Sequence, residues 1–310
     1  MADQVQERTL QLSVTAEGSM YPPGQQHRLL DVARVADQLG VDYVDVTDHV
    51  LLGEGALTAG MGWERQHLDL IMTEPLITLA AMTGVTQRIK LLSSILIAPL
   101  RPAGLLAKSA ATLHALSRGR FVMGVSVSWQ RDEYDALGVP YHMRGQILDD
   151  QLHACRLLWT TAPASFHSAT VNFDGVYCSP RPAPDERIPI WFGGHFTQKL
   201  VERIVTLGDG WLISGSLGLT LEQKRDAIHA IRLRWAEAGR DLATLHISGD
   251  VPPLDCSIES SVEQIPALVQ AGVTNVRMHL RPFAKSPDDV LDVLAEVVRH
   301  CEPYRSLEVS

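Results

Sequence analysis

The chain has 310 residues, of which 45% are hydrophobic and 20% are charged, and its formal net charge at pH 7 is −9. This composition is typical of a globular protein, and a negative charge without a basic stripe argues against nucleic acid as a partner. No apolar run reaches the roughly 18 residues that a membrane-spanning helix needs, so we expect no membrane segment.

The four cysteines are widely spaced and form no CxxC pair. Such spacing is typical of a reduced protein rather than of a disulfide framework or a zinc site. The polar N-terminus, MADQVQERTL, lacks the apolar core of an export signal, so the sequence predicts a cytoplasmic protein. HxH and HExxH patterns and clustered carboxylates are absent, and we therefore expect no metal site.

Hydrophobic periodicity and turn residues divide the first half of the chain into alternating strands and helices. The predicted strands are Thr9–Ala16, Tyr43–Thr47, Ile89–Ala98 and Arg120–Val127. The predicted helices are Arg28–Leu39, Glu74–Val85 and Ala103–Leu116. Between them, Val50–Thr73 is rich in glycine and methionine, and loops of this length are usually functional or disordered.

The same alternation continues after a helix predicted at Ile147–Trp159. Residues 164–187 change character, and an Asp174-Gly175 turn between β-prone segments predicts an inserted β-hairpin. Strands are then predicted at Ile188–Phe192, Gly210–Ser214, Leu245–Val251 and Asn275–Leu280, and helices at Lys199–Leu207, Glu222–Ala238, Val262–Gln270 and Pro287–His300. Eight strands with about eight helices favour a single (β/α)8 TIM barrel over residues 1–310, with a doubly wound sheet as the alternative.

In a barrel of this kind the active site lies where the strands end. These ends carry Asp48 and His49, Ser94 to Ala98, Val127 to Trp129, Gly193 to His195, Ser214 to Ser216, and His279 with Arg281. Glycine and serine dominate the set, which suits a flat cofactor with a phosphate that needs close backbone approach. The small residues around Ser128 would leave backbone N–H groups for a phosphate if a helix begins at Gln130; the alternative is an ordinary core strand and loop.

His49 is the candidate with an acid–base role, because an imidazole beside a carboxylate can exchange protons at neutral pH. The alternative is that Asp48 caps the next segment and His49 only packs. Trp129 either walls a ring pocket or lies over the barrel mouth. Glu133 and Tyr134 follow it on a predicted helix, so at least one of them should point away from the site. The GxSxG elbow of hydrolases and the GxGxxG of dinucleotide sites are both absent.

Taken together in this order, several motifs resemble the bacterial luciferase-like monooxygenases, and more closely their branch that depends on the deazaflavin coenzyme F420. The motifs are TDH at Thr47–His49, EPLITLAAMTGVTQRIKL at Glu74–Leu91, the segment Ala107–Arg144 around GVSVSW, IPIWFGG at Ile188–Gly194, and GDGW at Gly208–Trp211. The resemblance implies a (β/α)8 barrel with an insertion near strand seven or between strands four and five, and a homodimer.

The resemblance also implies roles for individual residues. Asp48 and His49 match the pair near the cofactor ring, and a non-prolyl cis peptide behind that ring maps onto Ser94–Ile95. The strand-four loop near the cofactor tail matches Val127, Ser128 and Trp129, and the phosphate-binding loop of strand five matches Gly193 and Gly194. One departure stands out, because GVSVSW has serines where relatives often have glycines in GVGVGW.

The sequence therefore predicts an F420-dependent oxidoreductase that transfers a hydride to or from a small, apolar organic substrate, with His49 moving the proton. An apolar pocket is expected from Met61, Trp63 and Met72. The acidic cofactor tail would need cations, for which Arg101, Arg131, Lys199 and Arg281 are candidates. The alternative is an FMN-dependent monooxygenase that uses oxygen and a separate reductase. A third hypothesis is a barrel without cofactor binding, which the retained TDH and GDGW motifs disfavour.

Overall fold

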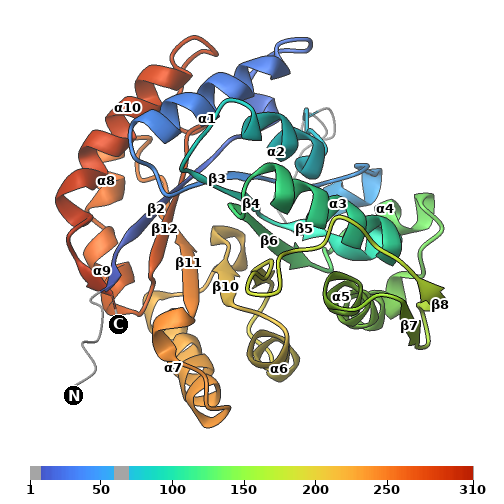
Figure 1. Ribbon diagram of the computed structural model, residues 1–310. Coiled ribbons are helices and arrows are strands. Elements are labelled where there is room, and N and C mark those ends of the chain that lie inside the picture. The colour runs from blue at the N-terminus through green and yellow to red at the C-terminus, as the bar shows by residue number, and fades with distance from the viewer. Residues whose placement is uncertain (1–7, 59–69, 310) are drawn as a thin grey trace.

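The structure is a computed structural model that describes residues 8–58 and 70–309. Its centre is a closed barrel of parallel strands surrounded by helices (Figure 1). The barrel strands are β2 (Gln11–Thr15), β3 (Tyr43–Val46), β4 (Lys90–Ser93), β6 (Phe121–Ser126), β9 (Ile190–Gly193), β10 (Gly210–Ile213), β11 (His246–Asp250) and β12 (Asn275–His279). Strand β12 pairs with β2 and strand β4 pairs with β6, so the eight-stranded ring closes. The predicted (β/α)8 TIM barrel is confirmed.

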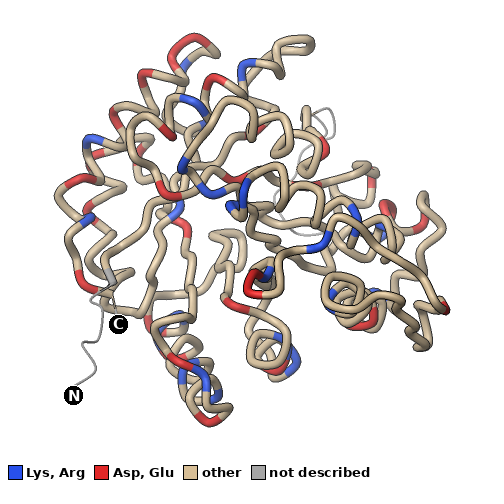
Figure 2. Tube along the Cα trace, viewed as in Figure 1, with Lys and Arg blue, Asp and Glu red and all other residues tan. Residues whose placement is uncertain are grey.

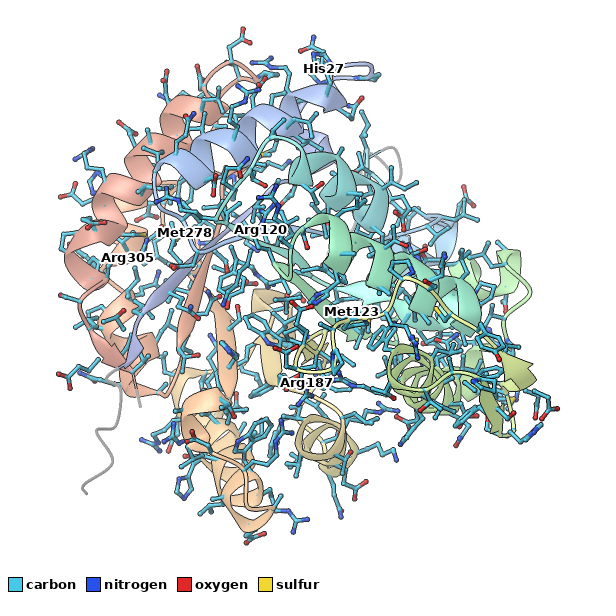
Figure 3. All side chains as sticks on the ribbon, in the orientation of Figure 1. His27, Arg120, Met123, Arg187, Met278 and Arg305 are labelled. Atoms are coloured by element: carbon cyan, nitrogen blue, oxygen red, sulfur yellow. The ribbon has the colours of Figure 1, made fainter. Side chains whose placement is uncertain are left out.

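The helices that surround the barrel follow the strands in the expected alternation. They are α1 (Leu29–Gln38), α2 (Pro75–Thr83), α3 (Ala103–Leu116), α4 (Arg131–Ala136), α5 (Arg144–Thr160), α6 (Gln198–Thr206), α7 (Leu221–Glu237), α8 (Ile258–Val262), α9 (Ile265–Gln270) and α10 (Val290–Cys301). Charged residues lie mainly on these outer helices and on the loops (Figure 2). In the side-chain view, Arg120 and Met278 lie over the barrel strands, whereas His27 and Arg305 lie at the periphery (Figure 3).

Inside the barrel, apolar and polar layers follow each other along the strands. Tyr43, Leu92, Val122, Trp191 and Leu212 form a buried apolar cluster separate from the main core between strands and helices. Side chains alternate between the two faces of a strand, so Asp45 shares the inward face of β3 with Tyr43 and lies closer to the carboxyl end. Asp250 and Arg277 end the inward faces of β11 and β12 in the same way, so the rim of the barrel is polar on this side.

The third barrel strand is interrupted, whereas the sequence predicts one strand over Ile89–Ala98. Strand β4 ends at Ser93, the peptide between Ser94 and Ile95 is cis, and a short strand β5 (Leu96–Ile97) continues beside β6. The cis peptide is where the resemblance places it.

The inserted hairpin is present, but the predicted turn is wrong. Strands β7 (Ala164–His167) and β8 (Asn172–Val176) are antiparallel, so Asp174 and Gly175 lie within β8 rather than in the turn. The chain reverses at residues 168–171 instead, where the backbone N–H and hydroxyl of Thr170 donate to Asp150 of α5. This tertiary anchor outweighs the local Asp-Gly signal.

Two other differences concern the ends of elements. The helix predicted at Val262–Gln270 begins later, as α9 at Ile265, and a separate short helix, α8, ends at Val262 before it. A two-residue strand β1 (Arg8–Thr9) pairs with β13 (Glu308–Val309) at the base of the barrel. Of the predicted substrate loop, Met61 and Trp63 lie outside the described residues.

Candidate active site

His49 lies just after β3 and contacts a carboxylate from a distant part of the chain. Its Nδ1 is 3.2 Å from Oε2 of Glu133, whose side chain is fully buried on α4. The ring of Trp129 meets the imidazole edge-on, with 5.8 Å between ring centroids. The sequence predicts that at least one of Glu133 and Tyr134 points away from the site. Glu133 faces His49, whereas Tyr134 donates its hydroxyl proton to the carbonyl of Val127.

Helix α4 also holds the loop that follows His49. Oε1 of Glu133 accepts hydrogen bonds from the backbone N–H groups of Val50 and Leu51. Farther along the loop, Gly53 donates to Gln130 at 2.6 Å and Gly55 donates to Asp132 at 2.6 Å. These contacts join the loop after β3 to the loop after β6, across the barrel rim.

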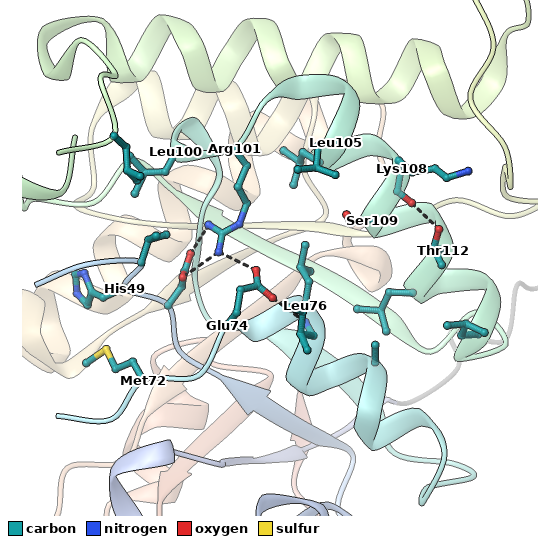
Figure 4. Close-up of a pocket in the computed structure, with 18 residues that line it drawn as sticks. His49, Met72, Glu74, Leu76, Leu100, Arg101, Leu105, Lys108, Ser109 and Thr112 are labelled. Carbon is teal, nitrogen blue, oxygen red and sulfur yellow. Dashed lines mark hydrogen bonds and ion pairs between the residues drawn. The ribbon is translucent and has the colours of Figure 1, made fainter. Parts of the chain in front are cut away.

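Asp48 faces away from His49 and has its own set of partners. Its carboxylate pairs with Arg101 at 2.7 and 3.1 Å and accepts a hydrogen bond from the backbone N–H of Ile97 at 2.8 Å. Arg101 also pairs with Glu74 at 2.9 Å (Figure 4). Burial raises the pKa of Asp48, although hydrogen bonds from Arg101 and Ile97 oppose the shift. The bond to Ile97 ties Asp48 to the strand segment that follows the cis peptide.

The cationic side chains predicted to bind an acidic cofactor tail lie in surroundings that differ from one to the next. Arg101 is nearly buried and is engaged by Asp48 and Glu74. Lys199 pairs with Asp149 and Glu202, and Arg131 pairs with Asp135 on the exposed surface of α4. Arg281 is exposed and lies close enough to Glu17 to lower its pKa.

The cis peptide and the end of strand β9 form one surface of the site. Ser94 and Ile95 form a bulge between β4 and β5. The backbone N–H of Ser94 donates to the carbonyl of Val46, which ties this bulge to the end of β3. A Cβ at Gly193 would lie 2.7 Å from Cγ2 of Ile95, so a side chain at position 193 would collide with the bulge. The close approach of Gly193 to Ile95 thus brings the end of β9 against the segment that contains the cis peptide.

The loop after β6 contains a strained and unsatisfied serine. Ser128 has a φ of 57°, in the left-handed region that glycine adopts without cost. Its buried Oγ has no hydrogen-bond partner among the described residues. Relatives often have glycine here, which fits the observed backbone. A buried hydroxyl without a partner is a donor that a bound group could satisfy. The serine that lies beside the end of β9 is Ser126, whose Oγ is 3.9 Å from the Cβ that a side chain at Gly194 would add.

A second histidine lies at the end of β12, which is separated from β3 by β2 alone. Nδ1 of His279 is 2.9 Å from Glu17 and Nε2 is 3.5 Å from Asp250. Burial opposes the charge of His279, but the hydrogen bonds that Asp250 and Glu17 accept from its ring raise its pKa to about 10. Arg277 pairs with the same Asp250 at 2.5 Å and donates to Oγ of Ser94. The sequence places His279 at a strand end, but nothing in it indicates this cluster.

Deeper in the same half of the rim, a buried acid lacks a full set of partners. Asp45 accepts a hydrogen bond from Thr15 at 3.2 Å, while its Oδ1 has no partner among the described residues. Burial raises the pKa of Asp45 to about 6, and the positive charge of Arg277 limits the rise.

An apolar groove of about 820 Å³ lies outside the barrel, between α2 and α3, and reaches Asp48 and His49 (Figure 4). Its wall includes Ile77, Leu105 and Leu116, whose exposed fractions are 71%, 59% and 59%. Met72, expected in the substrate pocket, lines this groove. Helix α2 contains no charged residue, whereas α1 and α10 carry charges on their outer faces.

Neither a metal-binding cluster nor a membrane-spanning helix is found among the described residues 8–58 and 70–309. They contain no group of three or more His, Cys, Asp or Glu side chains arranged to hold a metal ion. None of their helices is both long and apolar enough to cross a bilayer.

Comparisons with known proteins agree with this geometry. The family model described as luciferase-like monooxygenase matches residues 9–285. An uncharacterised protein of Mycobacterium tuberculosis is 32% identical over 206 residues, which cover 66% of this chain and 68% of that protein. The FMNH(2)-dependent dimethylsulfone monooxygenase of Pseudomonas putida is 27% identical over 53% of this chain and 42% of its own length. A solved F420-dependent secondary alcohol dehydrogenase has a TM-score of 0.74 at 16% identity, covering 94% of this chain and 99% of that chain.

Proposed function

Because the chain belongs to the luciferase-like monooxygenase family, we propose that it is an oxidoreductase that transfers a hydride between coenzyme F420 and a small organic substrate. The observation that carries the proposal is the contact between His49 and Glu133 beside the bulge at Ser94–Ile95. A histidine held by a buried carboxylate at a barrel rim is suited to accept or donate a proton. We propose alcohols, ketones and enones as substrates, since each exchanges one proton with each hydride.

The residues proposed to hold the cofactor come from three neighbouring strand ends. Ser94, Ile95 and Gly193 would support the ring, and Asp48 would keep the bulge in place through its bond to Ile97. Val127, Ser128, Trp129 and Gly194 would contact the tail, with the hydroxyl of Ser128 donating to its phosphate. When bound, a deazaflavin accepts or donates a hydride at the carbon where FMN has a nitrogen. His49 would then supply or remove the accompanying proton, on oxygen for an alcohol or ketone and on the carbon next to the carbonyl for an enone.

The second candidate is an FMN-dependent monooxygenase that uses oxygen and a separate reductase. The relative in Pseudomonas putida supports it, because that protein is named for its dependence on FMNH(2). The two candidates share the barrel and the rim residues, so the cofactor decides between them.

Oxygen dependence separates the two reactions directly. The enzyme is mixed with reduced F420 and a panel of small ketones and enones, with and without oxygen, and cofactor oxidation is followed by absorbance. The proposal predicts substrate-dependent oxidation of F420 that persists without oxygen. Oxidation of reduced FMN that requires both substrate and oxygen, with none of F420, would favour the monooxygenase.

We also propose that the protein is a homodimer that uses the α2–α3 face. A surface helix without a polar face is usually covered, and the exposed side chains of Ile77, Leu105 and Leu116 form one apolar surface that a two-fold axis would place against itself. Light scattering after gel filtration should give a dimer for the wild type and a monomer for Leu105→Glu. Leu233→Glu, at a 51% exposed position of α7, is the control. A monomeric wild type would contradict this proposal.

A further inference from the structure

Glu133 is the fully buried carboxylate nearest to the proposed proton-transfer group, and the family comparison gives it no role. Four donors surround its two oxygens. Val50 and Leu51 donate backbone N–H groups to Oε1, and Gln130 lies 3.4 Å from Oε2 through its amide nitrogen. The fourth is Nδ1 of His49, at 3.2 Å from Oε2. A carboxyl group whose two oxygens both accept hydrogen bonds is best satisfied in the deprotonated form, as a carboxylate.

This arrangement selects one form of the histidine. A carboxylate only accepts hydrogen bonds, so the neighbouring Nδ1 must carry the proton. In the neutral ring, Nε2 is then the basic nitrogen. We propose that Glu133 is a positioning residue for His49, fixing the tautomer in which Nε2 exchanges the proton with the substrate. The inference deepens the proposed function and rests on it for the identity of the proton-transfer group.

The position of the ring is fixed by the same helix. The bonds from Glu133 to Val50 and Leu51 hold the backbone that directly follows His49. Gln130 reinforces them by donating to the carbonyl of Leu51 at 2.9 Å. Glu133 therefore acts on both the backbone and the ring, whereas Asp132 binds only farther along, at Gly55.

The other charged groups that the structure describes near His49 are engaged elsewhere. Asp48 and Glu74 pair with Arg101, and Asp132 accepts from Gly55. These groups still influence how turnover depends on pH, because the negative charge of Glu133 contributes to raising the pKa of Asp48. A pH profile alone is therefore a secondary readout, and the tautomer of the ring is the primary one.

The primary experiment measures the histidine tautomer by nitrogen-15 NMR on the protein labelled at its 12 histidines, without cofactor or substrate. A His49→Gln variant identifies the His49 signals. The wild type should show the Nδ1–H form in its neutral state. Glu133→Gln places an amide against Nδ1, where its N–H₂ group can donate, and the ring should switch to the Nε2–H form. Asp132→Asn is the matched control on the same helix and should keep the wild-type tautomer.

The second readout is turnover with the cofactor that supports it. Glu133→Gln should lower kcat roughly 100-fold, because the wrong nitrogen then carries the proton, while KM changes less than about threefold. The pH profile of kcat should also shift, which a loss of fold alone would not produce. Asp132→Asn should retain kcat within about threefold.

The outcomes separate this inference from the proposed function. An unchanged tautomer in Glu133→Gln would overturn the positioning role, whatever the turnover. A switched tautomer in a protein without F420-dependent turnover would support the positioning role and contradict the proposed function. If Glu133→Gln does not fold, the wild-type spectrum decides: the Nδ1–H form of neutral His49 supports the inference, and the Nε2–H form overturns it.

Discussion

Two histidines lie at the same rim of the barrel, and they are held in different ways. His49 follows β3 and, among the described residues, contacts the carboxylate of Glu133, which comes from a helix that also fixes the adjoining backbone. His279 ends β12 between two carboxylates, Glu17 and Asp250, and its pKa is raised to about 10. One carboxylate orients an imidazole, whereas two keep it charged at neutral pH. The comparison indicates that His49 is suited to proton exchange and His279 to holding the rim together.

The largest expected effect is on turnover. His49→Ala should lower kcat between about 100-fold and 10,000-fold, the usual range for loss of a general acid or base. Its free energy of unfolding should fall by about 1 kcal/mol, because Glu133 keeps the hydrogen bonds that it accepts from the backbone N–H groups of Val50 and Leu51. Steady-state kinetics and urea unfolding measure the two quantities. Wild-type turnover in this variant would show that His49 does not move the proton.

His279→Gln should have the opposite result, with a large loss of unfolding free energy and a smaller effect on turnover. Removing one member of a buried ionic cluster leaves Asp250 and Glu17 insufficiently compensated, which costs about 3 kcal/mol of unfolding free energy. The same urea experiment measures the loss. A variant as stable as the wild type would mean that the cluster contributes no net stability.

The dependence of the free energy of unfolding on alkaline pH tests the role of the charge on His279. The pKa of His279 is higher in the folded protein than the ordinary value near 6.5, so its stabilising contribution is complete below that pH. It is lost as the pH rises through about 10, where the folded protein also releases the proton. The difference in unfolding free energy between wild type and His279→Gln should therefore narrow between pH 7 and pH 10. A constant difference would show that charge is not the cause.

The smallest expected effect is at the proposed tail-binding loop. Ser128→Gly should raise the unfolding free energy by about 1 kcal/mol, because glycine adopts the observed φ of 57° without strain and the buried orphan hydroxyl is removed. Cofactor affinity should fall in the same variant if the hydroxyl binds the phosphate. Thermal unfolding and fluorescence titration test the two parts separately.

Much of the fold could be predicted because it depends on local patterns. Alternating apolar runs and helical periodicities were sufficient for the eight strands and the barrel. The interruption at Ser94–Ile95 came only from the resemblance, since IKLLSSILIA, apart from its lysine and two serines, is apolar as a continuous buried strand would be. The hairpin turn was misplaced because Asp150, which anchors Thr170, lies 20 residues away.

The residues of the site could be predicted from the sequence, but the side chains with which they pair could not. Asp48 and His49 are neighbours in sequence, yet Arg101 holds one and Glu133 the other, at separations of 53 and 84 residues. The direction in which Glu133 points depends on where α4 begins, and a one-residue shift would turn it away. Likewise, Glu17 and Asp250 meet His279 only because the barrel closes.

The central claim is that this rim binds a deazaflavin, and a fluorescence titration of the purified protein tests it most directly. Oxidised F420 and FMN are added separately, to the wild type and to Ser128→Gly. The proposal predicts saturable, tighter binding of F420 than of FMN, weakened in the variant. Tight binding of FMN with weak binding of F420 would contradict it and identify the protein as an oxygen-using monooxygenase.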